Sequence, residues 1–209
     1  MLRNVYRYTD EEGSFIVKLA RRSIEEYLSR GVVIDPPPDT PSKLYAKSGV
    51  FVTLNKLVGG VKELRGCIGF PYPTHPLVEA TIKAAIESAV GDPRFPPVDI
   101  DEMDHIVVEV SLLTPPEEVK VDDPRLLPSA IEIGRDGLIV QRGVYSGLLL
   151  PQVPVEQGWD QEEFLSYCCL KAGLPPDAWL LRNTRIYRFR AEVFEEEHPR
   201  GSVHRRSLR

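Results

Sequence analysis

Three segments of the chain carry apolar side chains at helical spacing, which predicts three amphipathic helices. Thr9 with Glu12, and Asp160 with Glu163, each place a short polar side chain three residues before a glutamate, the pattern that caps a helix N-terminus. A glycine directly follows each segment, and glycine commonly ends a helix because it adopts the left-handed conformation without strain. The predicted helices span residues 9–30, 74–90 and 160–172.

Alternating apolar residues, or short apolar runs between turn residues, predict the strands. Residues 49–54 and 61–69 flank Gly59-Gly60 and predict a hairpin, and residues 105–113 form the clearest strand pattern. Strands do not alternate strictly with helices, so the pattern favours an α+β fold with a largely antiparallel sheet and flanking helices. Further expected elements are a hairpin over residues 131–142 that turns at 135–137, a short strand at 145–151 and a closing strand at 184–195.

The domain prediction places the folded part of the chain in residues 1–194, with a smaller lobe at about 115–155. Residues 195–209 turn from acidic to basic and contain almost no apolar side chains. Such a composition cannot bury enough apolar surface to repay the entropy of ordering. We therefore expect a disordered tail after residue 194.

Composition then excludes several classes of function. The 209 residues carry a formal net charge of -5, which is a poor match to the phosphates of nucleic acid or to anionic membranes. No apolar run approaches the ~20 residues of a membrane span. Three cysteines give no disulfide framework, so the cytoplasm is the expected location. With three Asn and two Met against nineteen Pro, the composition is typical of a heat-adapted protein.

The stretch Leu-Arg-Gly-Cys-Ile-Gly at residues 64–69 is the strongest candidate for chemistry. Regular alternation would place its two aliphatic side chains in the core and Arg65 with Cys67 on the other face. A neighbouring guanidinium favours the thiolate, and Gly66 and Gly69 allow a ligand or another backbone to approach closely. These features fit a nucleophile or redox thiol. A buried structural cysteine beside a glycine bulge is the alternative from the residues alone.

Residues 64–69 also resemble the signature of the AMMECR domain family. Other segments agree with that family's pattern, and the match runs from about Thr9 to Phe194. The resemblance implies an uncharacterised, archaeal-type member with an α+β fold, whose larger and smaller lobes flank a cleft near the signature. It implies no activity; in some microbial lineages the domain is associated with radical-SAM and Memo-type proteins, which are therefore possible partners. The further matching positions are residues 49–54, 92–95, 147–153 and 171–174, together with Trp159 and Cys168.

Four residues outside the signature are further site candidates. Asp92 and Arg94 could lie at the rim of the cleft, although a helix stop with a local salt bridge explains them equally well. Glu109 is the carboxylate within the clearest strand and a candidate general base or ligand anchor, with a solvated or Arg-paired sheet face as the commoner alternative. Gln152 could bind a ligand through hydrogen bonds of its side-chain amide, although a strand-ending turn explains its position as well.

The histidines and the remaining cysteines contribute less. His75 is the histidine expected nearest to Cys67, with an exposed loop residue as the alternative. The four histidines have no metal-ligand spacing, so no metal or cofactor is predicted. Cys168 and Cys169 point about 100° apart on a helix, which makes a poor chelate, so both are assigned to the core.

Three functional hypotheses remain at this point, and whether the protein is an enzyme stays open. The first is a cleft beside residues 64–69 that binds a small polar or anionic ligand or a partner peptide. The second is a cysteine-dependent enzyme or redox protein that uses Cys67, with His75 or Glu109 handling protons. The third is a regulatory scaffold that docks another protein. Binding is preferred because the sequence lacks a convincing second member of a catalytic pair. The expected ligand contacts are Arg65, Gly66, Cys67, Asp92, Arg94 and Gln152.

Overall fold

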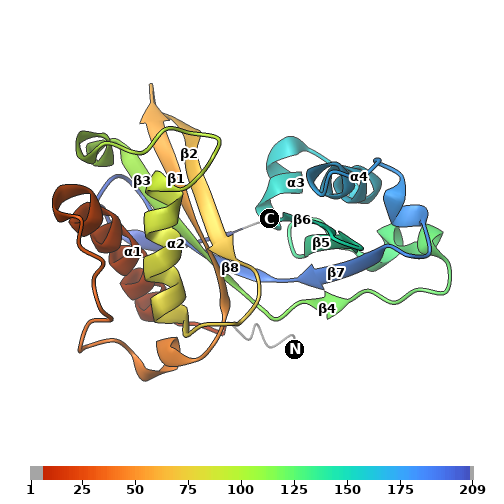
Figure 1. The fold of residues 1–209 in the computed structure, drawn as a ribbon, viewed down its shortest axis with the longest axis horizontal. Coiled ribbons are helices and arrows are strands. Elements are labelled where there is room, and N and C mark those ends of the chain that lie inside the picture. The colour runs from red at the N-terminus through yellow and green to blue at the C-terminus, as the bar shows by residue number, and fades with distance from the viewer. Residues whose placement is uncertain (1–6, 208–209) are drawn as a thin grey trace. The chain divides into compact units, whose positions relative to one another are not determined.

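The computed structural model describes residues 7–207 and forms two compact units (Figure 1). The first contains the chain up to Leu113 and again from Glu192 to Arg206, and the second runs from Thr114 to Ala191. The predicted smaller lobe at about 115–155 is therefore too short. The helix predicted at residues 160–172 and the strand that follows it belong to the second unit as well.

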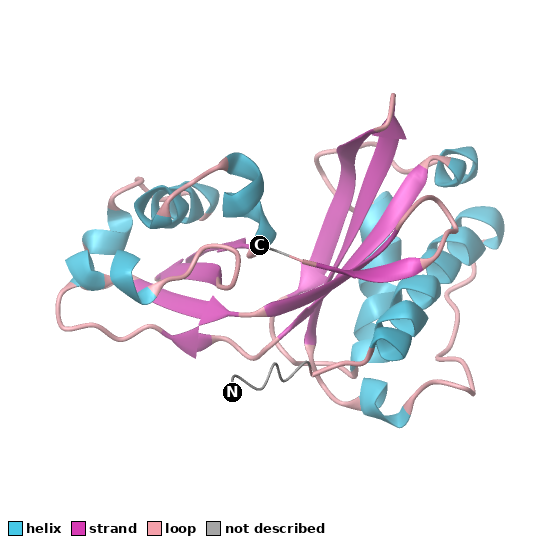
Figure 2. Ribbon diagram, turned by 180° about the vertical axis from the view of Figure 1, so that it is seen from behind, coloured by secondary structure: helices cyan, strands magenta, loops and turns pink. Residues whose placement is uncertain are grey.

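The first unit is a five-stranded sheet with the order β2-β1-β3-β8-β9. The pairs β1–β2, β1–β3 and β8–β9 are antiparallel. Two long helices cover one face of the sheet (Figure 2). Among the described residues of this unit no helix covers the other face, which we call the helix-free face. The elements are α1 (Asp10–Arg30), η1 (Ser42–Tyr45), β1 (Gly49–Val58), β2 (Val61–Phe70), α2 (Leu77–Val90), η2 (Ile100–Asp104), β3 (Ile106–Leu113), β8 (Ala191–Glu196) and β9 (Val203–Arg206).

The ends of the two helices follow from local chemistry. The predicted capping box of α1 is present: Thr9 accepts from the Glu12 N–H, and Glu12 accepts from the Thr9 N–H. Gly31 ends the helix in the left-handed conformation at φ 66°. Helix α2 begins at Leu77, three residues after the predicted start, because residues 74–76 pass through an extended segment that ends in a proline. The apolar stripes of both helices pack on Val50, Val52 and Leu54 of β1.

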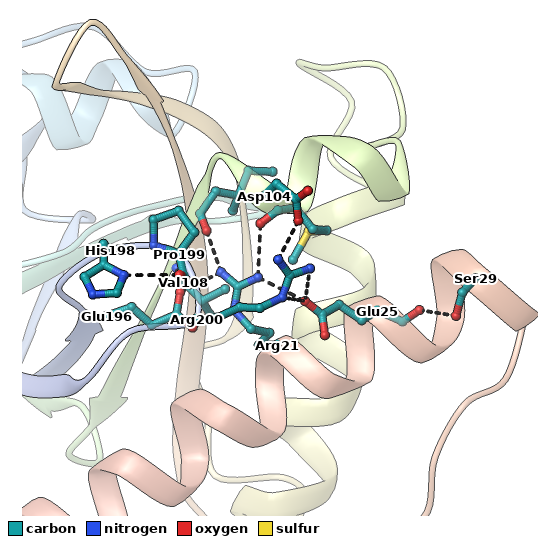
Figure 3. A network of polar contacts seen from close by, with 11 residues as sticks. Arg21, Glu25, Ser29, Asp104, Val108, Glu196, His198, Pro199 and Arg200 are labelled. Carbon is teal, nitrogen blue, oxygen red and sulfur yellow. Dashed lines mark hydrogen bonds and ion pairs between the residues drawn. The ribbon is translucent and has the colours of Figure 1, made fainter.

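A buried ion pair fastens α1 to the sheet (Figure 3). The guanidinium of Arg21 meets both carboxylate oxygens of Glu196, at 2.5 and 2.6 Å. It also donates to the carbonyl oxygen of Met103, and Glu196 accepts from the Val108 N–H at 3.0 Å. Each charge therefore has several partners, which a buried ion pair requires if it is not to destabilise the fold.

The predicted disordered tail is wrong for the residues up to Arg206. Strand β9 pairs with β8 from Glu196↔Val203 to Val193↔Arg206. Ion pairs take the place of the apolar side chains whose scarcity indicated disorder: Arg205 reaches Asp10, and Arg206 reaches Glu109. Leu208 and Arg209, the end of the predicted tail, lie outside the described residues.

The second unit is a four-stranded antiparallel sheet with the order β4-β7-β5-β6. Its apolar core contains Phe164, Leu165 and both cysteines of α4, all fully buried, as predicted for Cys168 and Cys169. The elements are β4 (Glu117–Glu118), η3 (Pro124–Leu126), η4 (Pro128–Ala130), β5 (Gly137–Arg142), β6 (Tyr145–Leu149), α3 (Gln152–Gln157), α4 (Gln161–Lys171), η5 (Ala178–Leu180) and β7 (Arg185–Phe189).

Two strand predictions for this unit are wrong. Residues 131–142 do not form a hairpin; β5 pairs instead with β6, across a turn that contains Gly143 at φ 59°. The segment 184–195 is two strands, because β7 and β8 belong to different sheets and are separated at Arg190. The predicted α+β class, with largely antiparallel sheets and flanking helices, is confirmed. Within residues 7–207 no helix is both long and apolar enough to cross a bilayer.

Candidate functional site

A β-bulge at Arg65 changes the predicted geometry of the signature strand. Leu54 pairs with Gly66, whereas Asn55 pairs with Leu64, so Arg65 is an extra residue on β2. The bulge breaks the alternation, and Leu64 turns outward with 43% of its surface exposed. The prediction that Leu64 points into the core is wrong for this reason. Cys67 keeps its place on the helix-free face, opposite Thr53.

The Arg65 side chain is held by the loop that follows α2. Its Nε and Nη2 atoms donate to the two carboxylate oxygens of Glu102 at 3.1 and 2.9 Å. It also donates to the carbonyl oxygens of Pro96 and Pro97, and it lies over the Phe95 ring. The hydrogen bond from Arg65 lowers the pKa of Glu102 to about 2. This guanidinium therefore ties two segments together, a contact that the predicted interaction with the sulfur of Cys67 did not include.

Asp92 and Arg94 clamp the backbone of Cys67 from both sides of the residue. The Cys67 N–H donates to Asp92 Oδ2 at 2.8 Å, and Arg94 Nη2 donates to the Cys67 carbonyl oxygen at 3.3 Å. Arg94 also donates to both Asp92 oxygens, at 2.9 Å from Nε and 2.6 Å from Nη2. These hydrogen bonds therefore join the signature strand to the loop that follows α2.

The electrostatics of the clamp place Arg94 near the thiol. Hydrogen bonding from Arg94 lowers the pKa of Asp92 to about 2, so the carboxylate is charged at neutral pH. The pKa of Arg94 is raised, chiefly by Asp92 and in smaller part by the charge of the Cys67 thiolate. Arg94 is thus a cation whose charge interacts with that of a Cys67 thiolate.

Gly66 and Gly69 allow neighbouring elements to pack closely on the signature strand. A Cβ at Gly66 would lie 2.0 Å from the carbonyl oxygen of Ser88, at the C-terminal end of α2. A Cβ at Gly69 would lie 2.2 Å from the Val50 carbonyl oxygen and would also meet the Phe51 ring. Both glycines therefore admit another part of the same chain, which is the structural alternative weighed for them in the sequence.

A row of polar side chains crosses the helix-free face beside the clamp. Cys67, Thr53 and Glu109 lie directly opposite one another on β2, β1 and β3. Thr53 Oγ1 donates to the partly exposed Cys67 sulfur at 3.3 Å. Glu109 is buried, and its Oε2 accepts from Arg206 Nη1 at 2.8 Å. Opposite residues in a sheet are about 5 Å apart, so Cys67 and Glu109 are separated by roughly 10 Å.

Two predicted site residues lie outside the three strands that carry this row. His75 lies against the ring of Phe70, with centroids 5.7 Å apart, and its Nδ1 bonds to the Thr74 hydroxyl. Phe70 pairs with Val50 of the helix-covered face, so the proposed partnership of His75 with Cys67 lacks geometric support. Gln152 is buried at the start of α3 in the second unit.

Sequence reasoning missed two members of the site. Thr53 could have been found from the predicted hairpin, because the pairing of 49–54 with 61–69 brings it opposite Cys67 once the bulge is counted. Arg206 carried no such signal, since it lay in a segment assigned to disorder. Within residues 7–207 no cluster of three or more His, Cys, Asp or Glu side chains could hold a metal ion.

The two cysteines of α4 provide an internal contrast to Cys67. Burial raises the pKa of Cys168 to about 12 and that of Cys169 to about 11. Both thiols are fully buried, whereas Cys67 is partly exposed. A thiol reagent applied to the folded protein therefore reports on Cys67.

The chain is similar to a known protein family and to proteins of several archaea. The family model AMMECR1 matches residues 17–194. A protein of Pyrococcus abyssi is 64% identical over 200 residues, which cover 95% of this chain and 97% of that protein. A protein of Methanopyrus kandleri is 58% identical over 203 residues, which cover 97% of each chain.

A solved structure agrees with the fold. The crystal structure of the uncharacterized protein PH0010 from Pyrococcus horikoshii matches with a TM-score of 0.94 at 62% sequence identity. The match covers 97% of this chain and 100% of that one. The relatives come from thermophilic archaea, in agreement with the heat-adapted composition. The chain belongs to the AMMECR1 family.

Proposed function

We propose that this protein binds a small ligand with an anionic or polar group, or a peptide that carries one, on the helix-free face of β2 around Cys67. The observation that carries the proposal is the clamp on Cys67. It fixes the strand and leaves the Arg94 side chain 48% exposed next to the Cys67 carbonyl oxygen. Among residues 7–207, the hydrogen bonds of Arg94 use N, Nε and Nη2, and Nη1 is the donor that we propose for the ligand.

Binding fits the contacts of the row better than acid–base catalysis does. A catalytic thiol needs a proton acceptor within hydrogen-bond reach. Glu109 lies one strand further on and is paired with Arg206, and His75 lies beside Phe70 of the other face. The Thr53 hydroxyl acts as a donor in its contact with the sulfur.

A cysteine-dependent reaction is the second candidate, and one contact favours it. The Thr53 hydroxyl donates to the sulfur, and hydrogen bonds to a charged form stabilise that form. The cation of Arg94 acts in the same direction. The rate of iodoacetamide labelling against pH tests this candidate. An inflection well below the free-thiol value of ~8.5 supports a reactive thiolate, and an inflection at or above that value removes the candidate.

The binding proposal is tested by ligand protection of Cys67. Melting temperatures are measured against panels of carboxylates, phosphates, nucleotides and acidic peptides, and each stabilising compound is then tested for slowing of iodoacetamide labelling. A ligand present at 100 times its dissociation constant stabilises the folded state by about 2.7 kcal/mol. A flat result in every panel, with no protection of the thiol, overturns the proposal.

The chain supplies a matched control for the role of Arg94. Residues 123–125 repeat the tripeptide Asp-Pro-Arg of residues 92–94, with the same local ion pair but on an exposed surface of the second unit. We expect Arg94→Gln to weaken binding of a protecting ligand at least tenfold and Arg125→Gln to leave it unchanged. Equal affinities for the two variants would show that the anion is bound elsewhere.

A further inference from the structure

The bulge at Arg65 brings Leu64 onto the same face of the sheet as Cys67. Leu64 lies opposite Asn55, and Asn55 follows Thr53 by two residues on β1. Alternate residues of a strand point to one side, so Leu64 and Asn55 share the helix-free face with Cys67 and Thr53. The two cross-strand pairs are neighbours on this face and lie about 7 Å apart along the strands.

An apolar strip continues from Leu64 toward the end of the hairpin. Leu57 and Lys62 form the next cross-strand pair on the same face, and Leu57 is partly buried. Among the described residues, neither Leu64 nor Leu57 belongs to the apolar core of the first unit or packs against it. The ammonium of Lys62 binds Glu195 on β8 at 2.7 Å, and the methylene stem of this lysine adds to the strip.

The bulge exposes a leucine that a regular strand would bury. Without the extra residue, Leu64 would pair with Lys56 and share the face of Leu54, which is fully buried under the helices. The bulge therefore costs apolar burial. The side chain of the extra residue is held by Glu102 at 3.1 and 2.9 Å, which fixes the bulge in place. Bulges often redirect a side chain beside a functional site, so a leucine exposed in this way indicates a ligand that covers it.

The charges beside Cys67 suit a ligand with one negative charge. Arg94 is the cation proposed to bind the ligand, and its guanidinium already holds the buried carboxylate of Asp92, 2.6 Å from Nη2. A doubly charged group would be attracted by Arg94 but also repelled by Asp92 at similar range. A carboxylate therefore fits these surroundings better than a phosphate monoester.

We propose that the ligand of this face is an amphipathic carboxylate, whose anionic group binds Arg94 and whose hydrocarbon group covers Leu64 and Leu57. The inference rests on the proposed ligand face around Cys67 and names the ligand class for it. Cys67 adjoins both contacts, because Arg94 donates to its carbonyl oxygen and Leu64 belongs to the next pair of the same face. A ligand in this position covers the partly exposed sulfur, so iodoacetamide labelling reports its binding.

A series of straight-chain carboxylates tests the ligand class on the full-length protein. Protection of Cys67 from iodoacetamide is measured with acetate, butyrate, hexanoate and octanoate at constant ionic strength. Full burial of a methylene group strengthens binding about fourfold, so on this open face we expect at least a twofold gain per methylene. Hexylammonium and hexyl phosphate should protect at least tenfold more weakly than hexanoate.

Three results of this series would overturn the proposal. Equal dissociation constants for all four carboxylates would show that the hydrocarbon makes no contact, while the anion site at Arg94 would stand. Equal protection by hexyl phosphate and hexanoate would remove the preference for a single charge. If no carboxylate protects Cys67, the ligand class is wrong, whether or not another anion protects it.

Matched variants test the role of Leu64. Leu64→Ser should weaken octanoate binding at least fivefold and leave acetate binding unchanged, and Leu64→Met should restore octanoate binding. Val61 provides the control, since it is 63% exposed on the same strand but pairs with Val58 on the opposite face. Val61→Ser should bind every carboxylate like the natural chain.

The same assay separates this inference from the proposed anion site. Arg94→Gln should weaken acetate and octanoate by the same factor, because it removes the contact that the two ligands share. If Leu64→Ser binds octanoate as tightly as the natural chain does, the apolar contact is absent and the inference fails, even where Arg94→Gln weakens binding. If Arg94→Gln changes neither affinity, the anion site fails and the inference fails with it.

Discussion

The tripeptide Asp-Pro-Arg occurs twice, and its two copies have the same local structure in different surroundings. In both, the aspartate accepts from the backbone N–H and the Nε of the arginine, while Nη2 donates to its other oxygen. Hydrogen bonding from the arginine lowers the pKa of both Asp92 and Asp123 to about 2. The turn and its ion pair are therefore local properties of three residues.

The two carboxylates differ in their burial and in the hydrogen bonds that they accept from outside the tripeptide. Asp92 is 3% exposed and accepts the Cys67 N–H, whereas Asp123 is 39% exposed beside an arginine that is 81% exposed. Water screens the second pair and competes with it, so an equal pKa shift has unequal consequences for stability. The tripeptide alone therefore does not make a site. The first copy has a structural role because it lies against strand β2 and holds the backbone of Cys67.

The largest expected difference between the copies is in the loss of the aspartate. Asp92→Ala leaves the Cys67 N–H and the Arg94 guanidinium without their carboxylate, which we expect to lower the free energy of unfolding by about 3 kcal/mol. Asp123→Ala should cause no measurable change. Urea unfolding followed by circular dichroism measures both. Equal losses would mean that the clamp on Cys67 contributes nothing beyond the local turn.

The second expected difference is in acid. The pKa of Asp92 lies at about 2 in the folded protein, below its usual 3.8, so the stability it contributes is present above pH 4 and is lost as the pH falls toward 2. This loss amounts to roughly 2 kcal/mol. We expect Asp92→Asn to remove it and Asp123→Asn to follow the natural chain.

Unfolding free energies between pH 5 and pH 2 measure this effect. Glu102 titrates in the same window, because Arg65 lowers its pKa to about 2 as well. The difference between the natural chain and Asp92→Asn therefore isolates Asp92. A difference that does not change with pH would assign the stabilising contact to a group other than the Asp92 carboxylate.

The same contrast shows what the sequence can predict. Helix α1, the pairing of β1 with β2 and the buried cysteines of α4 follow from periodicity and capping, which act over a few residues. The position of Leu64 does not, because a one-residue bulge reverses the faces of a strand and has no marker beyond the glycine next to it. Local rules predict the elements but leave such shifts of register undetermined.

Long-range ion pairs are the second limit on prediction. Arg21 with Glu196, and Arg206 with Glu109, join residues that are 175 and 97 positions apart. No local pattern identifies such partners, and the residues 195–206 that supply one member of each pair have the composition of a disordered tail. The clamp can be predicted in part, since the sequence indicates Asp92, Arg94 and Cys67 as candidate site residues. The prediction for Arg65 did not include the bulge at this residue or its ion pair with Glu102.

The smallest expected difference concerns the two arginines. Arg94→Lys keeps the charge but cannot make two parallel bonds to Asp92 while also reaching the Cys67 carbonyl oxygen. We expect a loss of about 1 kcal/mol, which lowers the melting temperature by about 2–4 °C in a protein of this size. Arg125 makes no such contact with a neighbouring strand, so Arg125→Lys should have the melting temperature of the natural chain. Equal melting temperatures for the two variants would mean that the fork geometry of Arg94 is not used, and that its positive charge alone holds the clamp.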